Sequence, residues 1–202
     1  MTTTTTEPVA ATRSVTVRAV RAGNRAYLSA AHLEAVFGAG HRPVPCWAGL
    51  LAEPLCLERV GVVGGNRREA RARVVAVATP VSRLALTAQA LQQLDLRVPA
   101  RGPGPGAALS GPRGTVVLAD GVSRAAPRIL LPEGVARRLS LVPGAAYALE
   151  VSSWAEALGG PVTLECPAGL RDAVVVLDGA VQDRLGGPGA TVTARLTPVD
   201  GA

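Results

Sequence analysis

The stretch SRAAPRILLPEGVARR, Ser123–Arg138, contains the signals that decide the fold. Its first part is interpreted as a short strand. Its second part resembles a helix start, because Pro132 takes the first helical position and Glu133 lies in the first turn. A short strand that leads directly into a helix is therefore predicted, and the same order of elements recurs in the chain.

Four segments share one order of elements, namely a strand, a polar or Gly/Pro turn, a second short strand and a capped helix. The predicted caps of the other three helices are Ser29, Thr87 and Asp178. The segments are VTVRAVRAGNRAYLSAAHLEAVFGAG, RVVAVATPVSRLALTAQALQQLDL, TVVLADGVSRAAPRILLPEGVARRLSLVPG and VTLECPAGLRDAVVVLDGAVQDRLGGPG. The last two align almost residue for residue, which indicates internal duplication.

The composition supports a β-rich fold with a sizeable core. The chain has 202 residues, 48% of them hydrophobic and 2% aromatic, with 23 glycines and 16 prolines that favour short strands and turns. A strand-turn-strand-helix unit leaves one sheet face uncovered, and pairing two units into a barrel buries that face. We therefore expect a mainly β fold with short helices, made of two small β-barrels built from four strand-turn-strand-helix repeats.

The domain boundaries are expected near the most Gly/Pro-rich segment, ARGPGPGAALSGPRG at 100–114. We predict a disordered leader at 1–13 and a first barrel region at 14–113 that ends in this loop. A second barrel is predicted at 114–198, and the N-terminal strand at 14–22 is a candidate to join it.

The charged residues and cysteines exclude some chemistry and indicate a compartment. All 21 basic residues are arginine, so Schiff-base catalysis by lysine is excluded, and the Ala, Gly, Arg, Val and Pro bias is typical of a GC-rich bacterial genome. The net charge of +6 permits an anionic ligand. Three cysteines without CxxC spacing argue against disulfides or structural zinc and favour a cytoplasmic protein.

The sequence also bears on partners. It has no signal peptide and no apolar stretch of about 18 residues, so no membrane partner is expected. The few aromatic residues are scattered, which argues against binding of single-stranded nucleic acid, and the basic stretch GNRREARAR at 65–73 is interpreted as an exposed hairpin. A homo-oligomer is compatible with the sequence.

The segments LSAAHLEAVFGAG, TPVSRLALTAQAL and GVSRAAPRILLPEGVARRLSLVPG, in this order and spacing, resemble the PduL-type phosphotransacylases, or phosphate propanoyltransferases. The similarity runs from Val15 to Pro198. The resemblance implies two small β-barrels with active-site groups between them, and an acyl transfer between coenzyme A and phosphate on a two-zinc site.

The zinc ligands implied by the resemblance are absent from this chain. The positions that match the family's two His-x-His pairs, its glutamate and its last histidine are Arg25, Tyr27, Pro127, Ile129, Ala85 and Val175. The side chains of alanine, isoleucine, valine and proline offer zinc no ligand atom, so we expect no metal and no cofactor. His41 with Cys46 and Cys56 is the alternative metal set that remains.

The repeat alignment adds candidate site residues. It places Tyr27, Ala85, Ile129 and Val175 in one register, where they are expected to face one common, mostly apolar environment. Tyr27 is the candidate general acid and Arg25, two residues upstream, its electrostatic partner. The candidate substrate-binding residues are Arg83, Arg101, Ala85, Ile129 and Val175. The resemblance implies a phosphate-binding arginine at the place of Arg83 or Ser82, and Arg101 matches another arginine of the family. The apolar set is either an open pocket or a lost site that has collapsed into packed core.

The leading functional hypothesis is a metal-free relative of these acyltransferases that binds a hydrophobic acyl-chain or polyketide-type small molecule. Its enzymatic version transforms that molecule by cyclisation, isomerisation or dehydration, which need shape and one acid. The alternatives are a non-catalytic protein that binds an acyl compound, coenzyme A or a partner, then a residual phosphate acyltransferase, and a nucleic-acid-binding barrel.

Overall fold

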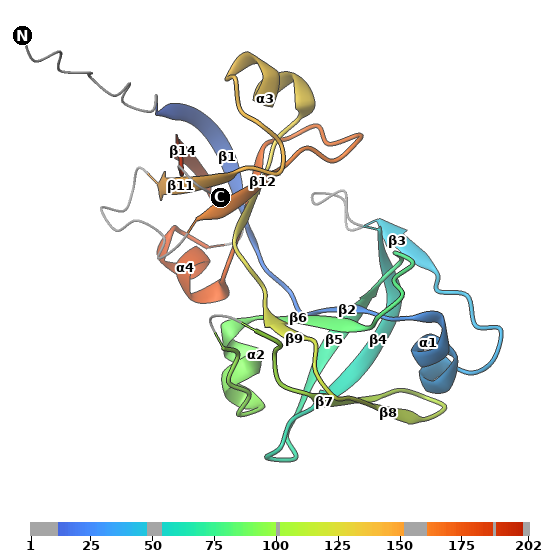
Figure 1. Cartoon of the computed structure of the whole chain (residues 1–202). Helices are drawn as coiled ribbons and strands as arrows, with labels where there is room; N and C mark the ends of the chain where they lie inside the picture. Colours follow the sequence, from blue (N-terminus) through green and yellow to red (C-terminus); the bar gives the residue numbers. More distant parts are fainter. Residues whose placement is uncertain (1–11, 48–53, 100–101, 152–160, 188, 200–202) are drawn as a thin grey trace, which may run out of the picture. The chain divides into compact units, whose positions relative to one another are not determined.

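The computed structural model describes residues 12–47, 54–99, 102–151, 161–187 and 189–199. The prediction of a mainly β fold with short helices is confirmed (Figure 1). The chain divides into two compact units, which are described separately. Unit 1 comprises 1–20, 127–176 and 183–202, and unit 2 comprises 21–126 and 177–182.

Unit 1 is a closed six-stranded barrel in the order β1-β13-β10-β12-β11-β14. Its strands are β1 (Arg13–Arg21), β10 (Arg128–Leu130), β11 (Ala146–Val151), β12 (Val162–Glu165), β13 (Val174–Leu177) and β14 (Thr191–Pro198). Helix α3 (Glu133–Arg138) follows β10. Helix α4 (Gly179–Arg184) follows β13, and its residues 179–182 belong to unit 2. β1 pairs antiparallel with β14, so the first strand completes a barrel formed otherwise by the C-terminal part of the chain (Figure 1).

Alternation of apolar and polar residues explains why these segments form the barrel. In β14, Val192, Ala194 and Leu196 are buried while the residues between them are exposed or half-buried. Tyr147 is buried in this core, and its hydroxyl has a hydrogen-bond partner. The hydroxyl accepts a hydrogen bond from the Val142 amide at 2.7 Å.

Unit 2 is an eight-stranded half-barrel sheet in the order β8-β7-β4-β5-β2-β6-β9, with β3 paired to β4. The first strands are β2 (Arg25–Tyr27), β3 (Pro45–Trp47), β4 (Pro54–Val63) and β5 (Glu69–Val75). The others are β6 (Arg83–Leu86), β7 (Ala107–Ser110), β8 (Thr115–Leu118) and β9 (Val122–Arg124). Helix α1 (Ala30–Phe37) contacts β8, and α2 (Ala88–Gln93) contacts β5. Strands β4 and β5 form the longest hairpin, and the inward residues of β5 are Ala70, Ala72 and Val74.

The boundary between the units falls between Ala126 and Pro127, later than residue 114. The reason is strand pairing, because β8 forms a hairpin with β7 and β9 runs parallel to β6. The third sequence repeat is therefore divided, with β8 and β9 in unit 2 and β10 and α3 in unit 1. Part of the Gly/Pro-rich loop forms β7. Of the predicted leader, 1–11 lies outside the described residues, and Arg13 already belongs to β1.

In unit 2, each of the first two repeats accepts a hydrogen bond from the amide at the start of the other repeat's helix. The Ser29 amide at the start of α1 donates to Ser82 Oγ at 2.8 Å, and the Thr87 amide at the start of α2 donates to Asn24 Oδ1 at 2.9 Å. Asn24 and Ser82 each lie five residues before their own cap, so the contact is reciprocal. Both caps match the sequence prediction, since Ser29 Oγ and Thr87 Oγ1 accept amides of their own helices.

Asn24→Ala should lower the free energy of unfolding by about 1–2 kcal/mol, because it leaves partly buried polar groups without their partner. Asn24 Oδ1 accepts from both the amide and the hydroxyl of Thr87, and its Nδ2 donates to Arg71 O. Urea unfolding measures the effect. Gln89→Ala, at an exposed position in α2, is the control and should change stability little. Equal midpoints for the two variants would contradict the assigned role.

Candidate functional site

Four of the predicted site residues share one face of the β2–β6 pair in unit 2. Arg25 lies opposite Ala85, and Tyr27 lies opposite Arg83 in the antiparallel register. Side chains of directly opposed residues lie on the same face of a sheet. The intervening pair, Ala26 and Leu84, is fully buried in the core, so the four site residues lie on the other face.

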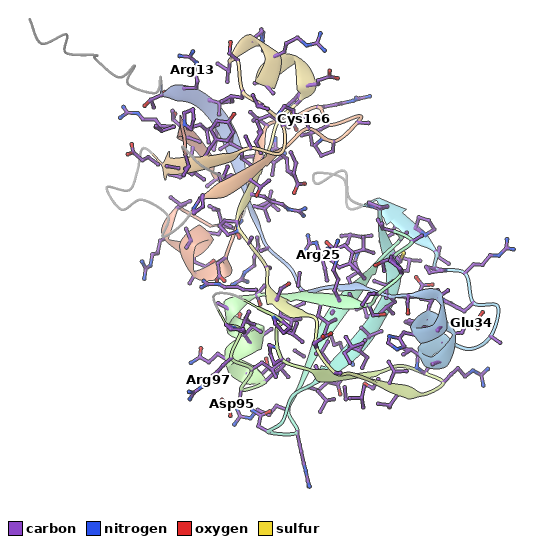
Figure 2. All side chains as sticks on the ribbon, viewed as in Figure 1. Arg13, Arg25, Glu34, Asp95, Arg97 and Cys166 are labelled. Atoms are coloured by element: carbon purple, nitrogen blue, oxygen red, sulfur yellow. The ribbon has the colours of Figure 1, made fainter. Side chains whose placement is uncertain are left out.

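The polar groups of this face contact one another. The guanidinium of Arg83 lies over the ring of Tyr27, 4.5 Å from its centroid, in a cation–π contact. Arg25 (Figure 2) is only 7% exposed and donates to the carbonyl of Gly23. Burial lowers the pKa of the Arg25 guanidinium from its usual value, and the charge of Tyr27 acts in the opposite direction. A phenol and two arginines thus lie on one face of this strand pair.

Ile129 and Val175 lie on the inward face of the unit 1 barrel. They oppose each other in the β10–β13 ladder, and both are fully buried, as is their neighbour Leu164. This corrects the expected register, in which they shared one environment with Tyr27 and Ala85. They belong to the packed core of their own barrel.

The physical reason is a shift of one residue between the halves. The helix cap follows Tyr27 and Ala85 by two residues, but Asp178 follows Val175 by three. Pro132 is the N-cap of α3 and not its first helical residue as predicted, and it also follows Ile129 by three. Because side chains alternate with a period of two, that shift turns a residue to the opposite face.

Counting from the caps reveals a residue that the sequence alignment missed. The fourth position before each cap is Arg25, Arg83, Arg128 and Val174. Arg128 is therefore the unit 1 counterpart of the two arginines in unit 2, and its Nη1 lies 3.3 Å from Glu165 Oε2. Anchoring the alignment on the helix starts is the signal that finds it. Arg101, the other predicted arginine, lies outside the described residues.

Unit 2 contains an apolar cleft of about 370 Å³. Its lining residues are Leu28, Ala30, Leu33, Pro43, Val74, Val75, Ala76, Val77, Ala78 and Thr79. The cleft lies where the parallel strands β2 and β5 end, because Leu28 directly follows β2 and 76–79 directly follow β5. Val77 is 46% exposed, so the cleft opens through an apolar rim. The signal in the sequence is the run VVAVA at 74–78, which stays apolar past the end of the strand.

The wall of the cleft that contains Pro43 is anchored by Glu58 on β4. His41 Nε2 lies 3.1 Å from Glu58 Oε1, and the Val44 amide donates to both oxygens of the same carboxylate. The ring of His41 also stacks on Phe37, with 5.0 Å between centroids. These contacts fix both ends of the short segment in which Pro43 lies.

A histidine and a serine of unit 2 lie within hydrogen-bonding distance of each other. His32 Nδ1 lies 2.8 Å from Ser82 Oγ. Ser82 is only 4% exposed, and its Oγ accepts the Ser29 amide. Since Asn24 makes the equivalent contact in the other repeat, the arrangement supports a helix-capping role for Ser82.

In the alternative metal set of His41, Cys46 and Cys56, the histidine and the first cysteine each contact another side chain. Cys46 Sγ accepts a hydrogen bond from Arg73 Nη1 at 3.3 Å, and His41 is held by Glu58. Burial first, then Glu58 and Cys46, raise the pKa of the Cys56 thiol to about 11. Among the described residues, no three His, Cys, Asp or Glu side chains form a group that could hold a metal ion. In the same part of the chain, no helix has the length and apolar character to cross a membrane.

A comparison with known protein families finds no matching family model, and no curated protein is similar to the chain.

Proposed function

We propose that the protein binds a hydrophobic acyl-chain or polyketide-type small molecule in the apolar cleft of unit 2. The observation that carries the proposal is the cleft itself, whose volume of about 370 Å³ suits a small molecule. Among the described residues that line the cleft, only Thr79 has a polar side chain, so apolar contact with the ligand dominates.

Catalysis within this proposal uses the residues next to the cleft. Tyr27 shares its face with the lining residue Val75, because each lies two residues beyond the opposed pair Arg25 and Arg73. Its ring is stacked against Arg83. Tyr27 would donate a proton to the ligand, while Arg83 and Arg25 would stabilise negative charge that develops as the proton is transferred. Cyclisation, isomerisation and dehydration are reactions that such an acid and a shaped cleft can promote without metal. The resemblance to PduL-type phosphotransacylases supports descent from an acyl-binding ancestor.

The test uses decan-1-ol as a neutral probe of the cleft. We expect it to bind the wild type in calorimetry, and Ala76→Trp, which places an indole among the lining residues, to weaken binding at least tenfold. Ala119→Trp is the matched control, because Ala119 is also exposed in unit 2 but does not line the cleft. Absence of binding to the wild type, or equal binding by both variants, would refute the proposal.

The catalytic part has a separate test. Tyr27→Phe keeps the aromatic ring under Arg83 and removes only the hydroxyl. Mass spectrometry of polyketide-type and acyl compounds incubated with each protein should show conversion by the wild type and none by the variant, with binding retained.

A further inference from the structure

Three arginines lie in a row across adjacent strands of unit 2. Arg59 on β4 is directly opposite Arg73 on β5, and Arg73 is directly opposite Arg25 on β2. Directly opposed residues point to the same face, and neighbouring strands lie about 4.8 Å apart. The three arginine side chains therefore leave the sheet on one face, which also contains Tyr27 and Arg83. We call these three residues the arginine row.

The arginine row is electrostatically unfavourable by itself. Like charges directly opposite each other destabilise a sheet, and Arg59 and Arg73 are such a pair. Arg25 has partners of its own, among them the carbonyl of Gly23. Within the described part of the chain, no carboxylate lies within 4.0 Å of the Arg59 or Arg73 guanidinium. Arg73 instead donates to Cys46 Sγ. Arg59 and Arg73 thus present positive charge that an external anion would compensate.

The arginine row adjoins the apolar cleft. Arg73 is followed by Val74 and Val75, which line the cleft, and Val75 points to the same face as Arg73. At about 3.3 Å per residue along a strand, Arg73 and Val75 are about 7 Å apart. A chain of a few carbon atoms spans that distance, so one ligand can occupy both places.

We propose that the arginine row binds the oxyanion of the molecule that occupies the cleft, so that the ligand is an acyl chain ending in a carboxylate or a phosphate ester. The planar guanidinium group matches both oxyanions through paired hydrogen bonds. This inference rests on the proposed function, because it names the ligand class of the same cleft.

A small oxyanion fits this face better than a nucleic acid does. Glu69 and Arg71 share the face of Arg73 on β5, and the Glu69 carboxylate lies over Gly61 on the neighbouring strand. The positive face therefore ends at an acidic residue. A nucleic-acid backbone requires a longer, uninterrupted track of positive charge.

The experiment compares decanoate, decyl phosphate and decan-1-ol by calorimetry at one ionic strength. We expect the wild type to bind at least one of the two anions about tenfold more tightly than the alcohol, and the preferred anion identifies the head group. Arg59→Gln and Arg73→Gln should each weaken binding of the anion about tenfold and leave decanol binding unchanged. Unchanged decanol binding also shows that the variants remain folded.

Arg97→Gln is the charge-matched control. Arg97 is exposed and follows α2, and Figure 2 shows it well separated from Arg25 within the same unit. Its replacement should change the affinity for none of the three probes. An equal loss of anion binding in this control would show a general charge effect and overturn the assignment to the arginine row.

The remaining outcomes separate this inference from the proposed function. Equal binding of decanoate, decyl phosphate and decanol, with Ala76→Trp still blocking all three, would overturn the oxyanion site alone. If decanol does not bind the wild type, the proposed function fails. The oxyanion site is still supported if inorganic phosphate binds the wild type saturably and Arg59→Gln weakens that binding. Binding of duplex DNA that falls steeply with salt and is lost in both row variants would assign the row to nucleic acid and overturn the inference.

Discussion

Leu84→Ala should lower the free energy of unfolding by about 2–5 kcal/mol, the cost of removing a large side chain from a packed core. Leu84 is fully buried and lies between Ala26 on β2 and Val122 on β9, both of them core residues. Ala26 is too small to fill the space, so a cavity would remain at the centre of the β2–β6 pair. Urea unfolding followed by circular dichroism measures the loss.

Val81→Ala is the control for this variant. Val81 is 67% exposed and lies only three residues before Leu84, so it removes apolar atoms from the same region without opening a cavity. Its effect should stay within about 0.5 kcal/mol. If the two variants were equally stable, the placement of Leu84 in the core would be contradicted.

Gly104→Ala should cost about 3 kcal/mol, because it forces two backbone segments apart. A Cβ atom at Gly104 would overlap the carbonyl oxygen of Val122, and a carbonyl cannot rotate away as the end of a side chain can. The neighbouring hydrogen bond from the Val122 amide to Pro105 O holds β9 against this loop. The midpoint of urea unfolding should therefore fall markedly.

The control is another glycine in the same unit. At Gly65, in the turn between β4 and β5, a Cβ atom would meet no heavy atom within 4 Å. Gly65→Ala should leave the midpoint nearly unchanged. A similar small effect at Gly104 would show that the approach of the two segments is not as close as described.

Part of the candidate site follows from the sequence. Tyr27 and Ala85 were selected from the repeat alignment, Arg25 from its place two residues before Tyr27 and Arg83 from the family resemblance. The β2–β6 ladder places all four on one face. That agreement arises because the two copies have the same number of residues between strand and cap. Ile129 was selected by the same alignment, but the longer connection to Pro132 turns it inward. No propensity or composition argument detects a shift of one residue.

The arginine row and the cleft could not be predicted in the same way. Arg59, Arg73 and Arg25 are separated in the chain and meet only because β4, β5 and β2 are neighbours in the sheet. The cleft likewise depends on the parallel pairing of β2 with β5. The stretch 65–73 was correctly located in a hairpin, but the direction of its arginines depends on that pairing.

The amino-acid sequence by itself determined the short strands, the helix starts at Ser29 and Thr87, and the repeat of these elements, because caps, turns and apolar alternation act between residues a few positions apart. Only the tertiary structure decided that β1 closes the barrel with β14, that β8 and β9 belong to unit 2, and which face each arginine occupies. Those features depend on pairing between distant segments, and a change of one residue in strand register reverses the face of every side chain.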